Sequence, residues 1–359
     1  MDAEADDGSG TESEAPGERI RGKYSCGNAV KAVQAFPDGL RVQDVPTPEP
    51  GPGEVLVKVA GAGLCHSDCM ISQHPQAFGR SDGMTIGHET AGWRVDTGEP
   101  VIVHAEFGCG ICAMCRRGAE RMCPQIAPSR GAGQGHDGGM AEFIKAPARA
   151  LVALPDAIDP VNAGPLDDAA LTPYHAIRTS MPWLEPGNVV AVIGIGGLGH
   201  MALQLLRAMT SATIVAVEKD PRKRAFAAEL GADVVLDPDD DAAAQIKSMG
   251  LEGASLVLDL VGNDQTLALA AASAARLGKI ICVGAAMGTY PFSMITVPFE
   301  TIVQTTYSGE PWELEAVVAL AAAGKLHVES THIGLDSVPE HLELIDRGEH
   351  PSGRLIAVP

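Results

Sequence analysis

The apolar and polar positions of this chain follow two different patterns in its two main parts. Between Ala29 and about Pro165, short β-rich runs such as AVKAVQAF (29–36) and GEVLVKVAGAG (53–63) are separated by stretches such as PTPEPGPGE (46–54). Short apolar runs bounded by proline and glycine predict strands joined by tight turns. We therefore expect a mostly antiparallel, partly barrel-like domain here.

From Val189 to about Val303 the pattern changes to apolar strands that alternate with alanine-rich amphipathic segments. The expected strands are NVVAVIGI, ATIVAVE, DVVL, SLVLDLVG and KIICVGA, and the clearest helical segments are MALQLLRAM and RKRAFAAEL. Regular strand–helix alternation predicts βαβ units, and so an α/β, Rossmann-type doubly wound parallel sheet. The last stretch returns to one helix and short strands, which we expect to rejoin the first domain.

The expected organisation has three parts. Residues 29–169 together with 308–359 are expected to form the β-rich domain, and residues 170–307 the α/β domain. Residues 1–28 have few apolar side chains and many acids, so they lack the means to offset the entropy of ordering and are predicted to be a disordered tail. With 359 residues, the chain is long enough for two domains.

Charge and cysteine content narrow the functional classes. The formal net charge of −20 disfavours binding to nucleic acid or to anionic membrane surfaces. The sequence shows neither a secretory signal nor a transmembrane-length apolar run, so a cytoplasmic enzyme is expected. In a reducing compartment the clustering of the eight cysteines points to metal binding instead of disulfides.

A glycine-rich stretch, VIGIGGLGHMALQLL (192–206), lies between the first predicted strand of the α/β part and the helix that follows it. Gly194, Gly196 and Gly199 form G-x-G-x-x-G, and Glu218 ends the next strand. The first glycine permits a tight turn, the second lets the backbone approach a pyrophosphate, and the third lets helix and strand pack closely. With strand, helix and acid all in place, the motif predicts dinucleotide binding.

Glu218 bears on which dinucleotide binds. A carboxylate at this point accepts hydrogen bonds from the adenosine ribose hydroxyls and repels a 2′-phosphate, which favours NAD. Four basic residues follow at once: Lys219, Arg222, Lys223 and Arg224. They either cover a solvated helix start or neutralise such a phosphate. We therefore expect NAD, with NADP as the alternative.

A second motif, CGICAMCRRGAERMC, places Cys109, Cys112, Cys115 and Cys123 in the spacing C-x2-C-x2-C-x7-C. Two-residue gaps let consecutive thiolates turn toward one ion, and four sulfurs complete a closed tetrahedral Zn²⁺ shell. A closed shell leaves no position for substrate, so this zinc is expected to be structural. An iron–sulfur cluster is the weaker alternative, because its usual cysteine runs have other spacings.

A third set of chemistry-bearing residues is dispersed along the chain. GLCHSD contains Cys65, GHE contains His88 and Glu89, and GPLDDAALTPYHAI contains Asp167 and Asp168. Each residue has an ordinary structural explanation, such as a buried thiol or an acid at a helix N-terminus. Spacing alone does not decide between those explanations and a catalytic site.

Taken together, these motifs resemble the zinc-dependent medium-chain alcohol dehydrogenases, closest to the bacterial secondary alcohol dehydrogenases. The resemblance runs from Val30 to Pro359 and is carried by GLCHSD, GHE, the four-cysteine segment, PLDDAALTPYH and VIGIGGLGH. It implies hydride transfer between a secondary alcohol or its ketone and NAD. It implies that residues 29–169 with 308–359 are a GroES-like catalytic, zinc-binding domain and that residues 170–307 bind the dinucleotide. It also implies two zinc ions per chain and a homodimer or homotetramer.

The resemblance further implies individual roles. Cys65, His88 and Asp168 are the expected ligands of a catalytic zinc, the choice of Asp168 over Asp167 resting on the alignment. Glu89 is similar to the glutamate that follows the ligand histidine in the family, and Ser67 to the hydroxyl that passes the alcohol proton onward. The expected cofactor-binding residues are Gly194, Gly196, Gly197, Leu198, Gly199, Glu218, Val261 and Val283.

The chain also departs from the family. Met70 stands where several relatives end the proton relay in histidine, so the proton is expected to leave through ribose hydroxyls and water. Ser308 stands where some relatives have a bulky aromatic residue, which would leave room for a larger substrate. His66 and His104 are expected to line the pocket or to be structural, Cys69 and Cys282 to be small buried side chains, and Cys26 to lie in the tail.

Three alternatives remain. One is a polyol or sugar dehydrogenase of the same fold. Another is an NAD(P)-dependent reductase that keeps only the structural zinc. The third is a binding protein that keeps the fold without activity. Metal content and a substrate panel separate them.

Overall fold

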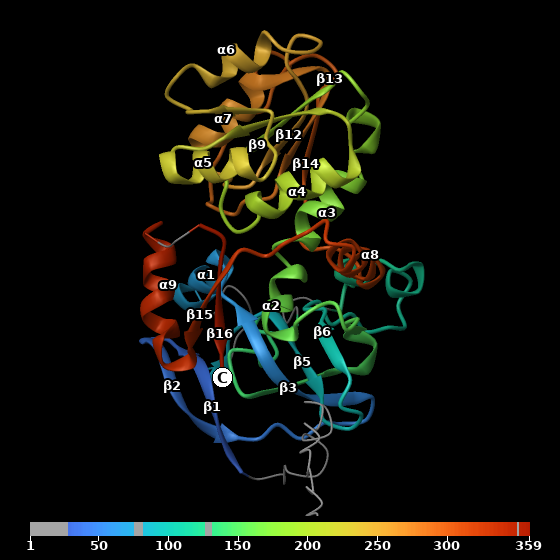
Figure 1. Cartoon of the computed structure of the whole chain (residues 1–359), viewed down its shortest axis with the longest axis vertical. Helices are drawn as coiled ribbons and strands as arrows, with labels where there is room; N and C mark the ends of the chain where they lie inside the picture. The colour runs from blue at the N-terminus through green and yellow to red at the C-terminus, as the bar shows by residue number, and fades with distance from the viewer. Residues whose placement is uncertain (1–27, 75–81, 126–130, 350–351) are drawn as a thin grey trace, which may run out of the picture.

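A computed structural model describes residues 28–74, 82–125, 131–349 and 352–359. Nearly all of the predicted tail, residues 1–28, therefore lies outside the described residues. The molecule has two lobes, drawn one above the other in Figure 1. Within the described part of the chain, no helix has the length and apolar character needed to span a bilayer.

The upper lobe contains a six-stranded parallel sheet, which confirms the predicted α/β fold class. Its strand order is β11-β10-β9-β12-β13-β14. The strands are β9 (Val189–Ile193), β10 (Thr213–Val217), β11 (Val234–Leu236), β12 (Ala254–Asp259), β13 (Ala274–Cys282) and β14 (Ile302–Thr305). The central strand β9 is buried at every position, as expected for a parallel strand covered on both faces.

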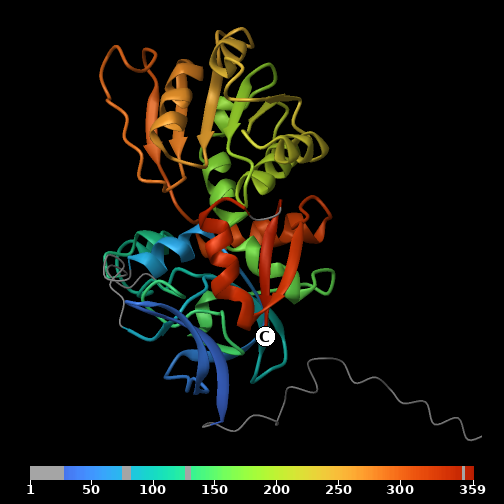
Figure 2. The same ribbon diagram turned by 90° about the vertical axis from the view of Figure 1, so that its left-hand side faces the viewer.

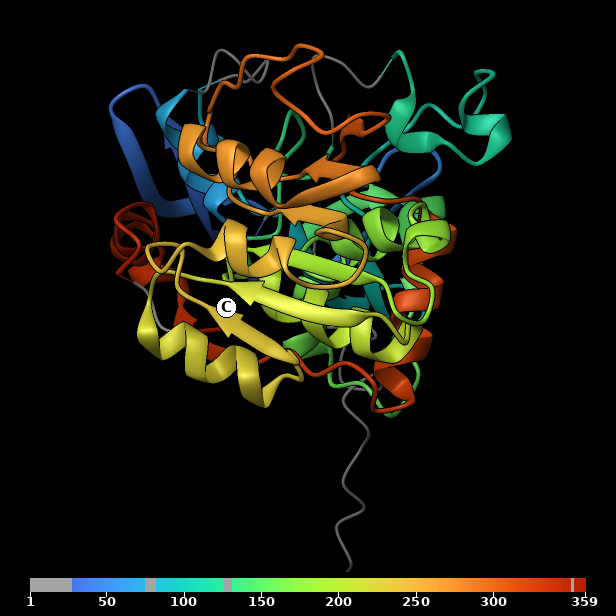
Figure 3. The ribbon, with the colours of Figure 1, turned by 90° about the horizontal axis from the view of Figure 1, so that it is seen from above.

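Helices cover both faces of this sheet, and successive strand residues supply the two cores. Val190 and Val192 pack with α4 (Gly199–Met209) and α5 (Pro221–Glu229), whereas Ala191 packs with α6 (Ala242–Lys247) and α7 (Asp264–Ser273). Seen from above, the yellow α5 and the orange α7 lie on opposite sides of the strands (Figure 3). The alternation follows from the two-residue period of a strand.

The lower lobe is mostly antiparallel, as predicted. A seven-stranded sheet has the order β15-β16-β3-β5-β6-β8, with β7 also paired to β3, and a three-stranded sheet has the order β2-β1-β4. The larger sheet contains β3 (Glu54–Gly63), β5 (Glu89–Arg94), β6 (Pro100–Val103), β7 (Phe143–Pro147), β8 (Leu151–Ala153), β15 (Ser330–Gly334) and β16 (Arg354–Val358). The smaller contains β1 (Ala29–Phe36), β2 (Gly39–Pro46) and β4 (Met84–Thr85).

The end of the chain rejoins this first lobe, as the sequence pattern indicated. β16 pairs antiparallel with β3, and Figure 2 shows the red C-terminal strands and helix beside the blue N-terminal strands. The remaining helices lie in or beside this lobe, and α3 and α8 run between the two lobes. They are α1 (His66–Gln73), α2 (Pro160–Ala163), α3 (Leu171–Arg178), α8 (Pro311–Ala322) and α9 (Val338–Asp346).

Candidate active site and metal centres

A cavity of about 860 Å³ lies where the two lobes meet, a volume typical of small-molecule and cofactor sites. The upper lobe contributes the glycine-rich turn after β9 and the carboxyl ends of its neighbouring strands. The lower lobe contributes Cys65, His88 and Asp168. One cavity therefore contains both the glycine-rich turn and the dispersed set of potential metal ligands.

The glycine-rich turn has the geometry that its sequence requires. Gly194 has φ +90°, a left-handed value that favours glycine, and a side chain at Gly199 would collide with the carbonyl oxygen of Gly194. A Cβ at Gly196 would meet no atom within 4 Å, because that position faces open space. α4 begins at Gly199, so its N-terminus offers unpaired N–H groups to an anion in the cavity.

Glu218 follows β10 and lines the cavity, with its carboxylate held by two backbone amides. Ile195 N donates to one oxygen at 2.7 Å and Asp220 N to the other at 2.9 Å. Of the four basic residues that follow, Arg222 pairs with Asp220 at 2.8 Å and Arg224 with Asp237 at 2.7 Å. The other two, Lys219 and Lys223, line the cavity.

The dispersed residues converge although they come from three separate segments. Cys65 lies between β3 and α1, His88 directly precedes β5, and Asp168 precedes α3. Asp168 Oδ2 lies 3.4 Å from Cys65 Sγ and 3.7 Å from His88 Nε2. Tetrahedral zinc with such ligands has neighbouring donor atoms about 3.3–3.6 Å apart, so sulfur, nitrogen and oxygen fit one ion.

Each of these three groups is oriented by a neighbour. Asp68 Oδ1 lies 3.1 Å from His88 Nδ1, and Asp68 Oδ2 accepts a hydrogen bond from Cys65 N at 2.9 Å. Thr172 Oγ1 donates to Asp168 Oδ1 at 2.9 Å. If Asp68 accepts the Nδ1 proton, the lone pair of His88 Nε2 faces the other ligand atoms. Neither Asp68 nor Thr172 was among the predicted site residues.

Glu89 lies in the same cluster of potential ligand atoms but its carboxylate faces a cation. Glu89 is 0% exposed and forms a two-point ion pair with Arg354, whose Nε donates to Glu89 Oε2 at 2.9 Å. Arg354 Nη2 also lies 3.4 Å from Asp168 Oδ2. A side chain at Gly197 would collide with the Arg354 guanidinium, so this arginine spans from the metal cluster to the glycine loop.

Charge in this cluster favours a cation. Burial opposes protonation of His88, but the charge of Asp68 and the hydrogen bonds to Asp168 and Asp68 outweigh it and raise the His88 pKa well above its usual value. Burial also opposes ionisation of Asp168, yet His88, Arg354 and Thr172 lower its pKa. The carboxylates thus stabilise a positive charge at this point. That charge is either a proton on His88 or a bound metal ion.

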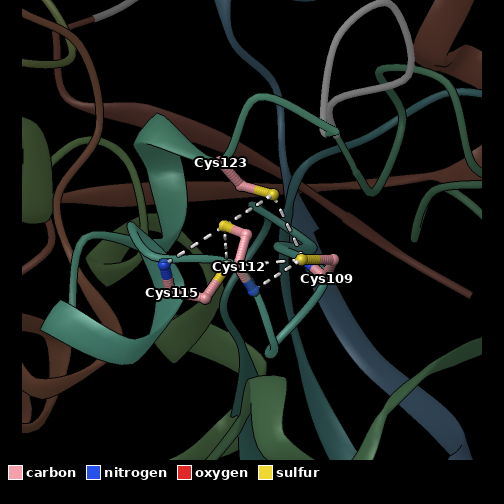
Figure 4. Close-up of side chains that lie close together, drawn as sticks. All are labelled: Cys109, Cys112, Cys115 and Cys123. Atoms are coloured by element: carbon pink, nitrogen blue, oxygen red, sulfur yellow. Dashed lines mark hydrogen bonds between the residues drawn. The ribbon is translucent and has the colours of Figure 1, made fainter.

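The four cysteines form a second cluster, shown in Figure 4. The Sγ atoms are 3.5 Å apart for Cys112 and Cys115, 3.8 Å for Cys112 and Cys123, and 3.9 Å for Cys109 and Cys115. A tetrahedron with zinc–sulfur bonds of about 2.3 Å has edges of about 3.8 Å, so the sulfurs fit one zinc ion. Backbone N–H groups lower the Cys109 pKa to about 6, which favours the thiolate.

The other predicted residues also have definite positions. Ser67 lines the cavity with its hydroxyl 3.6 Å from Cys65 Sγ, and His66 lines it with an exposed ring. Asp167 instead accepts a hydrogen bond from Ala105 N at 2.9 Å. His104 is buried between the carbonyl groups of Glu106 and Gly309.

Three further residues expected to bind the cofactor, Leu198, Val261 and Val283, also line the cavity. Cys282 is half-buried, and Cys26 lies outside the described residues. Cys69 is buried and has His66 and Asp346 within reach, but burial raises the pKa of its thiol to about 12, so we assign no ion there.

Comparison with known proteins follows the same division into two lobes. Residues 51–156 match the family described as alcohol dehydrogenase GroES-like domain, and residues 197–323 match zinc-binding dehydrogenase. The chain is 33% identical over 352 residues to D-arabinose 1-dehydrogenase (NADP(+)) of Saccharolobus solfataricus, covering 92% of this chain and 99% of that protein. This chain belongs to the zinc-containing medium-chain alcohol dehydrogenase family. It is therefore an NAD(P)-dependent zinc dehydrogenase.

Other family members agree in sequence and structure. An alcohol dehydrogenase of Geobacillus stearothermophilus is 30% identical and covers 90% of this chain and 97% of its own length. The crystal structure of the alcohol dehydrogenase from Aeropyrum pernix has a TM-score of 0.84 at 32% identity, covering 92% of this chain and all of that one. Acetophenone reductase from Geotrichum candidum, solved with NAD, has a TM-score of 0.82 at 27% identity, covering 94% and 99%.

Proposed function

We propose that this dehydrogenase interconverts a secondary alcohol and its ketone, with hydride passing to NAD⁺ in the oxidation and from NADH in the reduction. The observation that carries the proposal is the convergence of Cys65, His88 and Asp168 in the same cavity as the glycine-rich turn. A donor set of thiolate, imidazole and carboxylate leaves the fourth tetrahedral position for the oxygen of a substrate.

We assign Cys65, His88 and Asp168 as ligands of the catalytic zinc. Two anionic ligands and one neutral imidazole balance the charge of the divalent ion. When bound, zinc polarises the alcohol oxygen and lowers its pKa. Glu89 is adjacent, but its pairing with Arg354 keeps the carboxylate directed at the guanidinium. Glu89 and Arg354 then set the position of the metal cluster against the glycine loop.

Ser67 is the residue we assign to receive the proton of the alcohol. Its hydroxyl lies beside the ligand sulfur and lines the cavity. A hydroxyl both accepts and donates, so Ser67 passes one proton on for each that it takes up. Met70, on the same helix and also lining the cavity, offers no titratable group, so ribose hydroxyls of a bound cofactor and water would carry the proton onward.

NAD is the proposed cofactor, bound by the glycine-rich turn, Leu198, Glu218, Val261 and Val283. Glu218 places a fixed negative charge where the adenosine ribose of a Rossmann-bound dinucleotide lies, which opposes a 2′-phosphate. Arg222 and Arg224 are already paired with acids, which reduces what they offer to such a phosphate. The relative from Saccharolobus solfataricus is named for NADP, so both cofactors belong in the test.

The test is a spectrophotometric screen of alcohols and ketones with each of NAD⁺, NADP⁺ and their reduced forms, combined with zinc analysis. The proposal predicts two zinc ions per chain and NADH formation from simple secondary alcohols. Two zinc ions without oxidation of any alcohol would contradict the proposed reaction. One zinc per chain would instead support a reductase that keeps only the four-cysteine ion.

A second candidate is oxidation of a polyol or sugar. Glu106, Gln134 and Asp167 line the cavity, which gives this part of the wall polar groups to bind extra hydroxyls. Asp167 is 2% exposed, and its Oδ1 has no hydrogen-bond partner among the described residues. A sugar dehydrogenase predicts that Gln134→Leu lowers kcat/KM for polyols while kcat/KM for 2-butanol stays unchanged.

We also propose that the chain forms a homodimer or homotetramer. β14 is the last strand of the six-stranded sheet, and in the described part of the chain it pairs only with β13. Large apolar side chains are exposed before and along it, and these are Met287, Phe292, Met294, Ile295, Phe299, Ile302 and Val303. An open strand edge next to exposed apolar residues fits a second copy of the same sheet. Light scattering that gives the monomer mass would contradict this.

A further inference from the structure

Within the lower lobe, residues 109–123, which carry the four cysteines, are called the four-cysteine lobe. A buried ionic network joins it to the wall of the cavity. We call residues 307–310, between β14 and α8, the crossover segment. Tyr307 and Ser308 of this segment line the cavity. Ser308 has φ +48°, a left-handed value that is unusual for a residue with a side chain. Such a conformation persists where the surrounding contacts hold it, so the contacts of this segment decide the shape of the wall.

Arg121 makes most of those contacts. The Tyr307 hydroxyl donates to Arg121 O at 2.5 Å, and Arg121 Nη1 donates to Tyr307 O at 3.2 Å. Arg121 Nε lies 3.1 Å from Glu310 Oε1, and Arg121 N donates to Glu310 Oε2. One arginine therefore holds both ends of the crossover segment, through backbone and side chain.

The network continues to α3 and α8. The hydrogen bonds there determine which ring nitrogen of His175 carries the proton and which acids pair with the arginines. Arg121 Nη2 donates to His175 Nε2 at 2.8 Å, so that nitrogen carries the lone pair. His175 Nδ1 then donates to Glu313 Oε2 at 2.8 Å, and Arg178 Nε donates to the other oxygen of Glu313 at 2.5 Å. The half-exposed Arg178 and the buried Arg121 balance Glu310 and Glu313, so the buried charges of Arg121, Glu310 and Glu313 are all paired.

The position of Arg121 depends in turn on the four-cysteine lobe. Arg121 lies in the short 3₁₀ turn Glu120–Met122, directly before Cys123, the last of the four zinc ligands. A second tie runs the same way, because Trp312 Nε1 on α8 donates to Gly118 O, inside the lobe, at 3.2 Å. A displacement of the four-cysteine lobe would therefore displace the crossover segment, directly through Arg121 and from its C-terminal end through Trp312.

We propose that Arg121 is a positioning residue for substrate, through which the four-cysteine lobe fixes Tyr307 and Ser308 in the cavity wall. The lobe then contributes to substrate binding without touching the substrate or the cofactor. The inference rests on the proposed function only in that it takes this cavity to be the alcohol site.

The test compares Arg121→Lys with Arg149→Lys. Lysine keeps the positive charge, but its single ammonium cannot bridge Tyr307 O, Glu310 and His175 together. Arg149 lies in the turn Ala148–Ala150 and contacts the four-cysteine lobe, where it pairs with Glu120 at 3.5 Å. In the described part of the chain it makes no hydrogen bond or ion pair with the crossover segment. Arg149→Lys is therefore the matched control, and Arg121→Met is the stronger variant.

Arg121→Lys is expected to raise KM for the alcohol about tenfold, because a displaced wall loses contacts that bind the alcohol equally in the ground state and the transition state. The value of kcat should stay within about twofold, and KM for NAD⁺ and zinc content should match those of Arg149→Lys. The thermal midpoint should fall below that of Arg149→Lys, because His175 and Glu310 lose buried contacts to the guanidinium. Unchanged KM for the alcohol in both Arg121 variants would overturn the proposal. A loss of thermal stability without a change in KM for the alcohol would also overturn it. An equal rise in KM for the alcohol and in KM for NAD⁺ would do the same.

Hydrogen exchange gives a second readout that needs no activity. Amides of residues 305–312 should exchange faster in Arg121→Lys than in Arg149→Lys, since the segment loses its anchor. Equal exchange in the two variants would contradict the proposal. If the wild type oxidises no alcohol, the proposed reaction fails, while the exchange experiment still tests the anchor itself.

Discussion

The four-cysteine cluster and the Cys65–His88–Asp168 cluster are each suited to zinc, but the chain assembles them differently. The cysteines lie within a short stretch, and four sulfurs close the coordination shell. The three proposed ligands of the other cluster come from segments separated by up to 103 residues, and they are oriented by Asp68, Thr172 and Arg354. Backbone N–H groups of its own segment orient the sulfurs of the closed site, whereas the open site depends on side chains that are not ligands.

The largest expected effect comes from Cys65→Ser. Loss of the thiolate removes the catalytic ion, which supplies several kcal/mol of transition-state stabilisation, so kcat/KM should fall by about 10³ or more. Zinc content should fall from two ions per chain to one. Cys282→Ser, which lies outside both clusters, should keep both ions and full activity. Activity that survives Cys65→Ser would reject the assignment of the open site.

Cys112→Ser should act on stability first. The lobe loses a ligand from a closed shell, which we expect to cost about 4 kcal/mol or more and to lower the thermal midpoint by about 10 °C. Because the two clusters share no ligand, kcat of the folded fraction should persist. Differential scanning calorimetry and zinc analysis measure both effects. Simultaneous loss of both zinc ions would show that the clusters are not independent.

Asp68→Asn tests the supporting groups of the open site. An amide cannot replace the carboxylate that faces His88 Nδ1 and Cys65 N together, so affinity for the catalytic zinc should fall about 10–100-fold. Competition with a chelator measures this affinity. Asp96→Asn, which removes an exposed partner of Arg94, is the control. Equal zinc affinities in the two variants would show that Asp68 does not support zinc binding by His88 and Cys65.

The smallest expected effect concerns the cofactor end of the cavity. Glu218→Gln removes the charge that opposes a 2′-phosphate, and the ratio of kcat/KM for NADP⁺ to that for NAD⁺ should rise about tenfold. Lys219 and Lys223 are then available to the phosphate. An unchanged ratio would mean that Glu218 only holds the glycine loop through Ile195 N.

Local patterns in the sequence were sufficient for the fold class, the four-cysteine cluster and the glycine turn. Each depends on short-range spacing: strand–helix alternation, C-x2-C, or G-x-G-x-x-G. Arg354 was missed because it lies 265 residues from Glu89 and begins an otherwise apolar strand. A buried glutamate requires a buried cation, and that lone arginine before LIAV was the available signal.

Asp68 and the Arg121 network were missed for related reasons. Asp68 is three residues after Cys65, where an acid also serves to cap a helix, and α1 does begin there. Arg121 is one of several arginines around the cysteines, and only the fold brings it to Glu310. Pairing between charges far apart in the chain depends on tertiary packing, which local patterns do not encode.

Crystals diffracted at the zinc absorption edge test the central assignment most directly. The account predicts two anomalous peaks per chain, one among the four cysteine sulfurs and one bonded to Cys65, His88 and Asp168, with bonds of about 2.0–2.3 Å. Glu89 should remain on Arg354. A single peak at the four cysteines, in protein that oxidises alcohols at full rate, would contradict it.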